Sequence, residues 1–157
     1  MSIKKDFLKP VVDYLSLTRP IDWNQIFSRQ ATLEVEIGFG MGEVLLRMAK
    51  ENPQNNYVGI EQHTDRLYKT LGSITRDPGV GNNIRILRID AWEAFERLFA
   101  HQSIDKIYCL FPCPWPKKKH VKNRLFSTEF LKLANDRLKP NGQIQIVTDS
   151  PLFYDWV

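Results

Sequence analysis

The sequence predicts a single α/β domain, a doubly wound and mostly parallel sheet with helices on both faces. Three observations predict this fold class. Short apolar runs typical of buried strands alternate along the chain with segments of helical periodicity. A glycine-rich loop separates the first of these runs from the first helical segment. The 157 residues, 43% of them hydrophobic, are enough for one sizeable core but too few for two.

Each expected element has its own sequence signal. The strand-like runs lie at 32–37, 57–60, 84–89, 104–111 and 143–147. In the first two helical segments apolar residues recur three or four positions apart, namely Leu45, Met48 and Ala49, then Leu67, Leu71 and Ile74. Asp90 opens the third helix, and Ser127 is a typical N-cap for the fourth. The Pro-Asn-Gly sequence at 140–142 should end that fourth helix.

The two ends of the chain fit this pattern less well. We expect residues 1–30 to form an N-terminal extension that packs on a domain of residues 31–157, with Val11, Val12, Leu15 and Leu17 covering a sheet edge. After the fifth strand, PLFYDWV resembles the start of another helix. This interpretation leaves open whether further strands of the sheet follow.

Cysteine content and hydropathy limit the class of protein. Cys109 and Cys113 are the two cysteines, and no second pair or histidine cluster completes a zinc site, so no metal is expected. A reduced, cytosolic protein is the simpler interpretation. The N-terminus lacks the apolar stretch of a signal peptide, and no run is long enough to span a membrane.

The loop Glu36-Ile-Gly38-Phe-Gly40-Met-Gly42 is a candidate cofactor site. Its glycines let a ligand approach the main chain closely. The dinucleotide fingerprint requires a small residue where this chain has Glu43, so the NAD pattern fails. Glu36 and Glu43 would repel a pyrophosphate but favour the sulfonium and ammonium groups of S-adenosylmethionine.

Two further acids end the next two strands. Glu61 follows the second strand, where a carboxylate can accept both ribose hydroxyls, and Asp90 follows the third, where it can receive an adenine amino group. The alternative is that both are ordinary acids at helix N-termini, which the helix dipole favours. Three acids at one sheet edge argue for the ligand site.

The segment from Phe111 to Arg124 has the most specific sequence in the chain. Its prolines should hold Cys113 and Trp115 stiffly beyond the end of the fourth strand. Five cations then follow within eight residues, Lys117, Lys118, Lys119, Lys122 and Arg124, and they exceed the net charge of +4, so the basicity is local. An aromatic ring beside such cations suits a base and phosphates. The alternatives are a solvated loop and a tryptophan that packs only on that loop.

At this point the chain resembles the bacterial tRNA (guanine-N7)-methyltransferase family. The resemblance rests on DWNQIF at 22–27, EIGFGMG, GIE at 59–61, Asp90-Ala91, PWPKKKHVKNR and Thr148-Asp149. It implies a SAM-dependent, Rossmann-like methyltransferase fold and tRNA as the partner. It also implies cofactor binding by Glu36, Gly38, Gly40, Gly42, Glu61, Asp90, Ala91 and the residue at 113, and substrate binding by Trp115, the five cations and Asp149.

The chain departs from the family at two points. The family's aspartate in FPDPW, expected to serve the cofactor and catalysis, is Cys113 here. The family also continues past the fifth strand to a further substrate-binding segment.

Three hypotheses for function follow: methyl transfer to N7 of a guanine in tRNA, a catalytically impaired tRNA- and SAM-binding homologue, and an RNA pyrimidine C5 methyltransferase with Cys113 as nucleophile. Monomer and homodimer both stay open.

Overall fold

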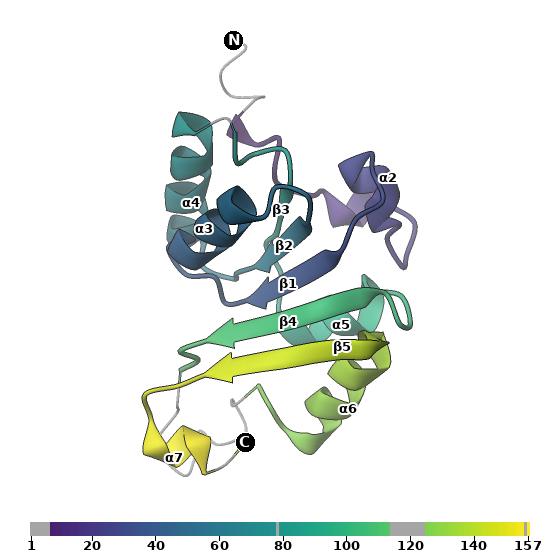
Figure 1. Ribbon diagram of the computed structural model, residues 1–157, viewed down its shortest axis with the longest axis vertical. Helices are drawn as coiled ribbons and strands as arrows, with labels where there is room; N and C mark the ends of the chain where they lie inside the picture. Colours follow the sequence, from purple (N-terminus) through teal and green to yellow (C-terminus); the bar gives the residue numbers. More distant parts are fainter. Residues whose placement is uncertain (1–6, 78, 114–124, 156) are drawn as a thin grey trace.

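The computed structural model describes residues 7–77, 79–113, 125–155 and 157, which form one sheet covered by helices (Figure 1). Five parallel strands lie in the order β3-β2-β1-β4-β5. Their bounds are β1 Leu33–Ile37, β2 Asn56–Ile60, β3 Ile84–Leu87, β4 Ile104–Leu110 and β5 Leu138–Val147. The predicted doubly wound α/β fold is confirmed.

The helices bury two apolar clusters, one on each face of the sheet. Helices α3 (Glu43–Glu51) and α4 (Thr64–Arg76) cover one face, where Leu45 and Leu71 are fully buried. Helices α5 (Ala91–Arg97) and α6 (Thr128–Arg137) cover the other face, where Phe95 and Phe130 are fully buried. Short helices lie near the ends of the chain: η1 Tyr14–Ser16, α2 Trp23–Phe27 and α7 Pro151–Tyr154.

The helix caps lie where the sequence predicts them. The carboxylate of Asp90 accepts a hydrogen bond from the Glu93 N–H at 3.2 Å, and the Ser127 hydroxyl accepts one from the Phe130 N–H, also at 3.2 Å. These bonds satisfy amide groups that have no partner inside the helix. The caps fix where α5 and α6 begin, and therefore where the loops after β3 and β4 end.

The last strand differs from the prediction. The fourth helix ends at Arg137 and β5 begins at Leu138, so residues 139–142 belong to the strand rather than to a separate turn. Pairing with β4 explains the difference, because Ile104 pairs with Leu138 while Lys106 pairs with Gln143. The Pro-Asn-Gly sequence forms the irregularity within one strand, and a bulge of this kind absorbs extra residues without ending the pairing.

The N-terminal segment packs on the sheet through part of its length, but Leu15 is 72% exposed, so the prediction that Leu15 covers the sheet edge is wrong. Val11 forms a parallel bridge with Ile86 of β3. Val12, Trp23 and Phe27 are buried in the same cluster as α5 and α6. The division of the chain at residue 30 stays a prediction. Within the described residues, no helix has both the length and the apolar character that a bilayer span requires.

Candidate functional site

A cavity of about 290 Å³ lies where β1 to β4 end. Residues that follow each of these strands line it, including Gly38 directly after β1, Glu61 directly after β2 and Asp90 three residues after β3. The sheet order reverses between β1 and β4, and this crevice at the carboxyl ends of the strands is where open α/β sheets bind ligands. The cavity brings together Gly38, Glu61, Asp90, Ala91 and Cys113 from the set predicted by sequence.

The glycine loop adopts a conformation that side chains disfavour. Gly38, Gly40 and Gly42 all have positive φ, at 71°, 57° and 78°. The Gly38 N–H donates to the carbonyl of Ile60 at 2.8 Å, and the Gly40 N–H donates to the Glu61 carboxylate at 3.1 Å. The loop is thus attached to the end of β2 by two hydrogen bonds. Gly38 lines the cavity, whereas Gly40 and Gly42 do not.

Glu61 is held from several sides although it borders the cavity. Its side chain is 4% exposed, and its second carboxylate oxygen accepts a hydrogen bond from the His63 N–H at 3.0 Å. The guanidinium of Arg66 lies 3.6 Å from the oxygen that also faces Gly40. Hydrogen bonds to the ionised form fix the orientation of a carboxylate. Glu61 is therefore a preoriented acceptor that joins the glycine loop to the start of α4.

Asp90 serves the helix and the cavity together. One oxygen caps α5, as described above, and the other accepts a hydrogen bond from the side-chain amide of Gln62 at 2.6 Å. Asp90 and Gln62 are both exposed and both line the cavity. Ala91, at 7% exposed, completes this wall. Gln62 was not predicted from the sequence. The one feature that could have indicated it is its position directly after Glu61.

Glu36 is the most deeply placed of the predicted acids. Its side chain is 3% exposed, and its Oε2 atom is buried without a hydrogen-bond partner among the described residues. Burial raises the pKa of Glu36 from 4.5 to about 7. Glu36 does not line the cavity itself, although its neighbour Ile37 does. The buried, unpaired oxygen is a position where a nearby cationic group would be stabilised.

The loop after β4 begins with a backbone strained for its residue type. Phe111 has φ of 52° and is 63% exposed, and its N–H donates to the Val147 carbonyl at 2.7 Å. Non-glycine residues with positive φ are uncommon and concentrate at functional sites. Phe111 and Pro112 line the cavity, as does exposed Cys113.

Cys109 also lines the cavity but differs from Cys113. It is 3% exposed, and burial raises the pKa of its thiol to about 12, with a further contribution from Glu36. The Cys109 thiol is therefore neutral near pH 7 and contributes as a small apolar group.

Most of the predicted substrate site lies outside the described residues, namely Trp115, Lys117, Lys118, Lys119, Lys122 and Arg124. Asp149, after β5, is exposed and does not line the cavity.

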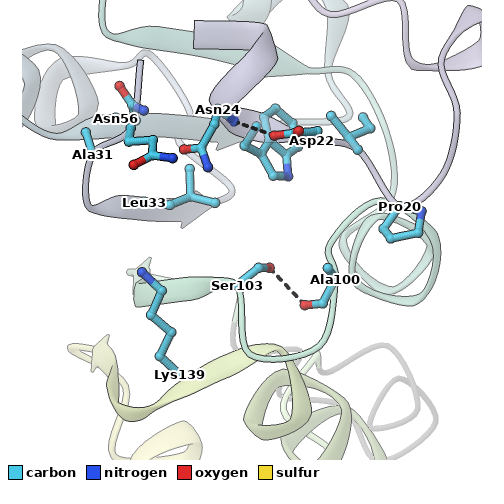
Figure 2. Close-up of a pocket in the computed structure, with 12 residues that line it drawn as sticks. Pro20, Asp22, Asn24, Ala31, Leu33, Asn56, Ala100, Ser103 and Lys139 are labelled. Carbon is cyan, nitrogen blue, oxygen red and sulfur yellow. Dashed lines mark hydrogen bonds between the residues drawn. The ribbon is translucent and has the colours of Figure 1, made fainter. Parts of the chain in front are cut away.

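A larger cavity, of about 630 Å³, lies at the opposite ends of the strands (Figure 2). Figure 2 shows Lys139 and Ser103 across this cavity from Asn24 and Asn56. Lys139 is already paired with Asp105 at 2.8 Å. None of the predicted site residues lines this cavity, so the smaller one is the candidate site. The described residues contain no group of three or more histidine, cysteine, aspartate or glutamate side chains placed to hold a metal.

Comparison with known proteins agrees with the predicted resemblance. The chain is 44% identical over 136 residues to a tRNA (guanine-N(7)-)-methyltransferase of Chlorobium phaeobacteroides, covering 86% of this chain and 66% of that protein. It is 38% identical over 130 residues to a protein of the same name from Thermotoga maritima, covering 83% of this chain and 41% of that protein. The chain thus spans between about two fifths and two thirds of the length of these relatives.

Solved structures confirm the fold. The 16S rRNA methyltransferase KamB matches with a TM-score of 0.60 at 18% identity, over 83% of this chain and 62% of that one. PKMT2 from Rickettsia typhi matches with a TM-score of 0.56 at 20% identity, over 74% of this chain and 20% of that one. At this identity the likeness concerns the fold alone.

A family model described as putative methyltransferase matches residues 30–157. Because this match extends over most of the sequence, the chain belongs to the putative methyltransferase family.

Proposed function

We propose that this chain binds S-adenosylmethionine in the cavity at the carboxyl ends of β1 to β4 and transfers its methyl group to N7 of a guanine in tRNA. The observation that carries the proposal is the set of carboxylates at that sheet edge: Glu61 and Asp90 in the wall, with Glu36 buried in β1 two residues before Gly38. The names of the relatives supply the substrate and the position of methylation.

The residues fit this cofactor in charge and in hydrogen bonding. The buried Glu36 oxygen without a partner suits a positively charged group nearby. Glu61 presents carboxylate oxygens that accept hydrogen bonds from ribose hydroxyls, and Asp90 offers acceptors for an adenine amino group. The cofactor supplies an electrophilic methyl on a sulfonium.

Held by Glu61 and Asp90, with Glu36 nearby, S-adenosylmethionine would supply a methyl group to the free lone pair of guanine N7, so no base would be needed to remove a proton. The electrons of the carbon–sulfur bond would stay on sulfur, and the guanine ring would gain the positive charge. The chain's task is therefore orientation and charge stabilisation. We assign the orientation of the guanine and its phosphates to Trp115, Lys117 and the neighbouring cations, together with Asp149.

The decisive experiment is direct. The full chain is incubated with methyl-labelled S-adenosylmethionine and bulk tRNA, and the digested RNA is analysed for labelled 7-methylguanine. Labelled 7-methylguanine is the expected product; label found instead in a C5-methylated pyrimidine would overturn the proposal. Cofactor affinity, measured on the same sample by calorimetry, separates a folded chain without transfer activity from an unfolded one.

Position 113 gives a second test of the reaction. A carboxylate beside the guanine would stabilise the charge that develops on its ring, an effect worth up to a few kcal/mol in other enzymes. We therefore expect Cys113→Asp to raise the rate of transfer about tenfold or more. Cys113→Asn is the matched control, because it has similar size without the charge. Equal rates for the two variants would show that the charge at position 113 plays no part.

A further inference from the structure

Gln62 connects the ends of two strands at the candidate cofactor cavity. It follows Glu61 at the end of β2, and its amide nitrogen donates to the Oδ2 atom of Asp90, 28 residues further on, at 2.6 Å. Its side chain is exposed and lines the cavity. This hydrogen bond places the Gln62 amide beside the acid that follows β3.

The partner of this amide determines which way it faces. An ionised carboxylate can only accept hydrogen bonds, so the atom of Gln62 that lies 2.6 Å from Asp90 must be the NH₂ group rather than the oxygen. The Oε1 atom is then directed away from that oxygen of Asp90. Among the described residues, no donor is hydrogen-bonded to Oε1. Gln62 is therefore anchored through its donor while its acceptor stays available.

The two side chains together offer acceptors to a ligand. Each oxygen of Asp90 already accepts one bond, from Glu93 N–H or from Gln62, and each can accept another. The anchored Gln62 adds the carbonyl oxygen of its own amide as a third acceptor. A ligand group with two N–H donors matches the three acceptor oxygens of this edge, whereas a carbonyl oxygen at the same place could pair only with the second N–H of the Gln62 amide and would leave those acceptors unpaired.

We infer that Gln62 is a specificity-determining residue of the cofactor site, which accepts a hydrogen bond from the exocyclic amino group of adenine while Asp90 accepts its second one. The inference rests on the proposed binding of S-adenosylmethionine in this cavity. It assigns to Gln62 the discrimination between a 6-amino purine and a 6-oxo purine. A residue that only positioned Asp90 would affect both kinds of base alike.

The test uses two ligands that differ only at the 6-position of the purine and at the adjoining N1, which carries a hydrogen in the 6-oxo form. S-adenosylhomocysteine and its inosine analogue, in which an oxygen replaces the amino group, are titrated into the full chain by calorimetry. We expect the wild-type chain to favour the adenine ligand, and Gln62→Leu to weaken it about tenfold while changing the inosine ligand less than about twofold. Gln143→Leu is the matched control, because Gln143 is an exposed glutamine of β5 that does not line the cavity.

Each outcome decides a separate point. Equal weakening of both ligands, or none, would overturn the role of Gln62 as a reader of the base. Failure of the wild-type chain to bind either ligand would overturn this inference and the cofactor site together. Normal ligand discrimination without formation of 7-methylguanine in tRNA would leave the inference standing and refute the proposed reaction alone.

Discussion

Gly42 is the position at which a single methyl group should damage the glycine loop most. It is the N-cap of α3 with φ of 78°, a conformation that costs a residue with a Cβ about 1–2 kcal/mol. A Cβ built at Gly42 would lie 2.5 Å from Cγ2 and 2.6 Å from Oγ1 of Thr70, far inside contact distance. Thr70 is fully buried and its hydroxyl donates to the Arg66 carbonyl at 3.1 Å, so it cannot move aside freely. Overpacking of this kind costs about 1–3 kcal/mol more.

We therefore expect Gly42→Ala to lower the free energy of unfolding by about 2–5 kcal/mol, as measured by urea denaturation. Gly40→Ala is the matched control, because Gly40 also has positive φ, of 57°, but nothing lies within 4 Å of its Cβ position. It should lose only about 1–2 kcal/mol. Combining Gly42→Ala with Thr70→Ala should recover part of the loss as a coupling free energy. Equal losses for the two glycine variants, without coupling to Thr70, would refute the steric explanation.

Two further predictions concern buried polar groups. Because burial raises the pKa of Glu36 from 4.5 to about 7, the folded chain holds a proton there that the unfolded chain has released, so the free energy of unfolding should fall as pH rises through this window. In Glu36→Gln, the fall in the free energy of unfolding between about pH 5 and about pH 8 should be smaller by up to about 3 kcal/mol. Urea denaturation at several pH values measures it, and the same pH slope in both proteins would contradict the prediction. Asn83, 3% exposed, donates to the carbonyls of Ala49 at 2.9 Å and Asn55 at 3.2 Å. Asn83→Ala should lower the free energy of unfolding by about 1–3 kcal/mol because these carbonyls lose their donor, whereas a change below about 0.5 kcal/mol would mean that water replaces it.

The fold was predictable because the signals that define it are local. The strands of a sheet covered on both faces are mostly apolar and buried, and β1 and β2 are buried along their whole length. The starts of two helices were also predictable, because Asp90 and Ser127 accept capping hydrogen bonds from amides only three residues away. The start of β5 was not predicted because the Pro-Asn-Gly sequence alone is typical of a turn. Pairing with β4, which joins distant parts of the chain, keeps these residues in the strand.

The candidate site was predictable in position but incompletely in composition. Glu61 and Asp90 stood out because a charge at the end of an apolar run is conspicuous in sequence. Gln62 carries no charge, and its contact with Asp90 joins residues that are distant in sequence. Cys109 and Phe111 reach the cavity because β4 ends beside β1, which only the order of the strands reveals.

The two interpretations of Asp90 offered by the sequence, a helix acid and a ligand acid, do not exclude each other. In a doubly wound sheet the loop after each strand leads directly into a helix, so the helix N-terminus and the ligand crevice occupy the same edge. Asp90 has two oxygens, and one caps α5 while the other holds Gln62 at the cavity. The cap fixes the carboxylate in one orientation, so less side-chain conformational entropy is lost when a ligand binds. The capping bond therefore preorganises the carboxylate that faces the cavity, and one side chain serves the helix and the site together.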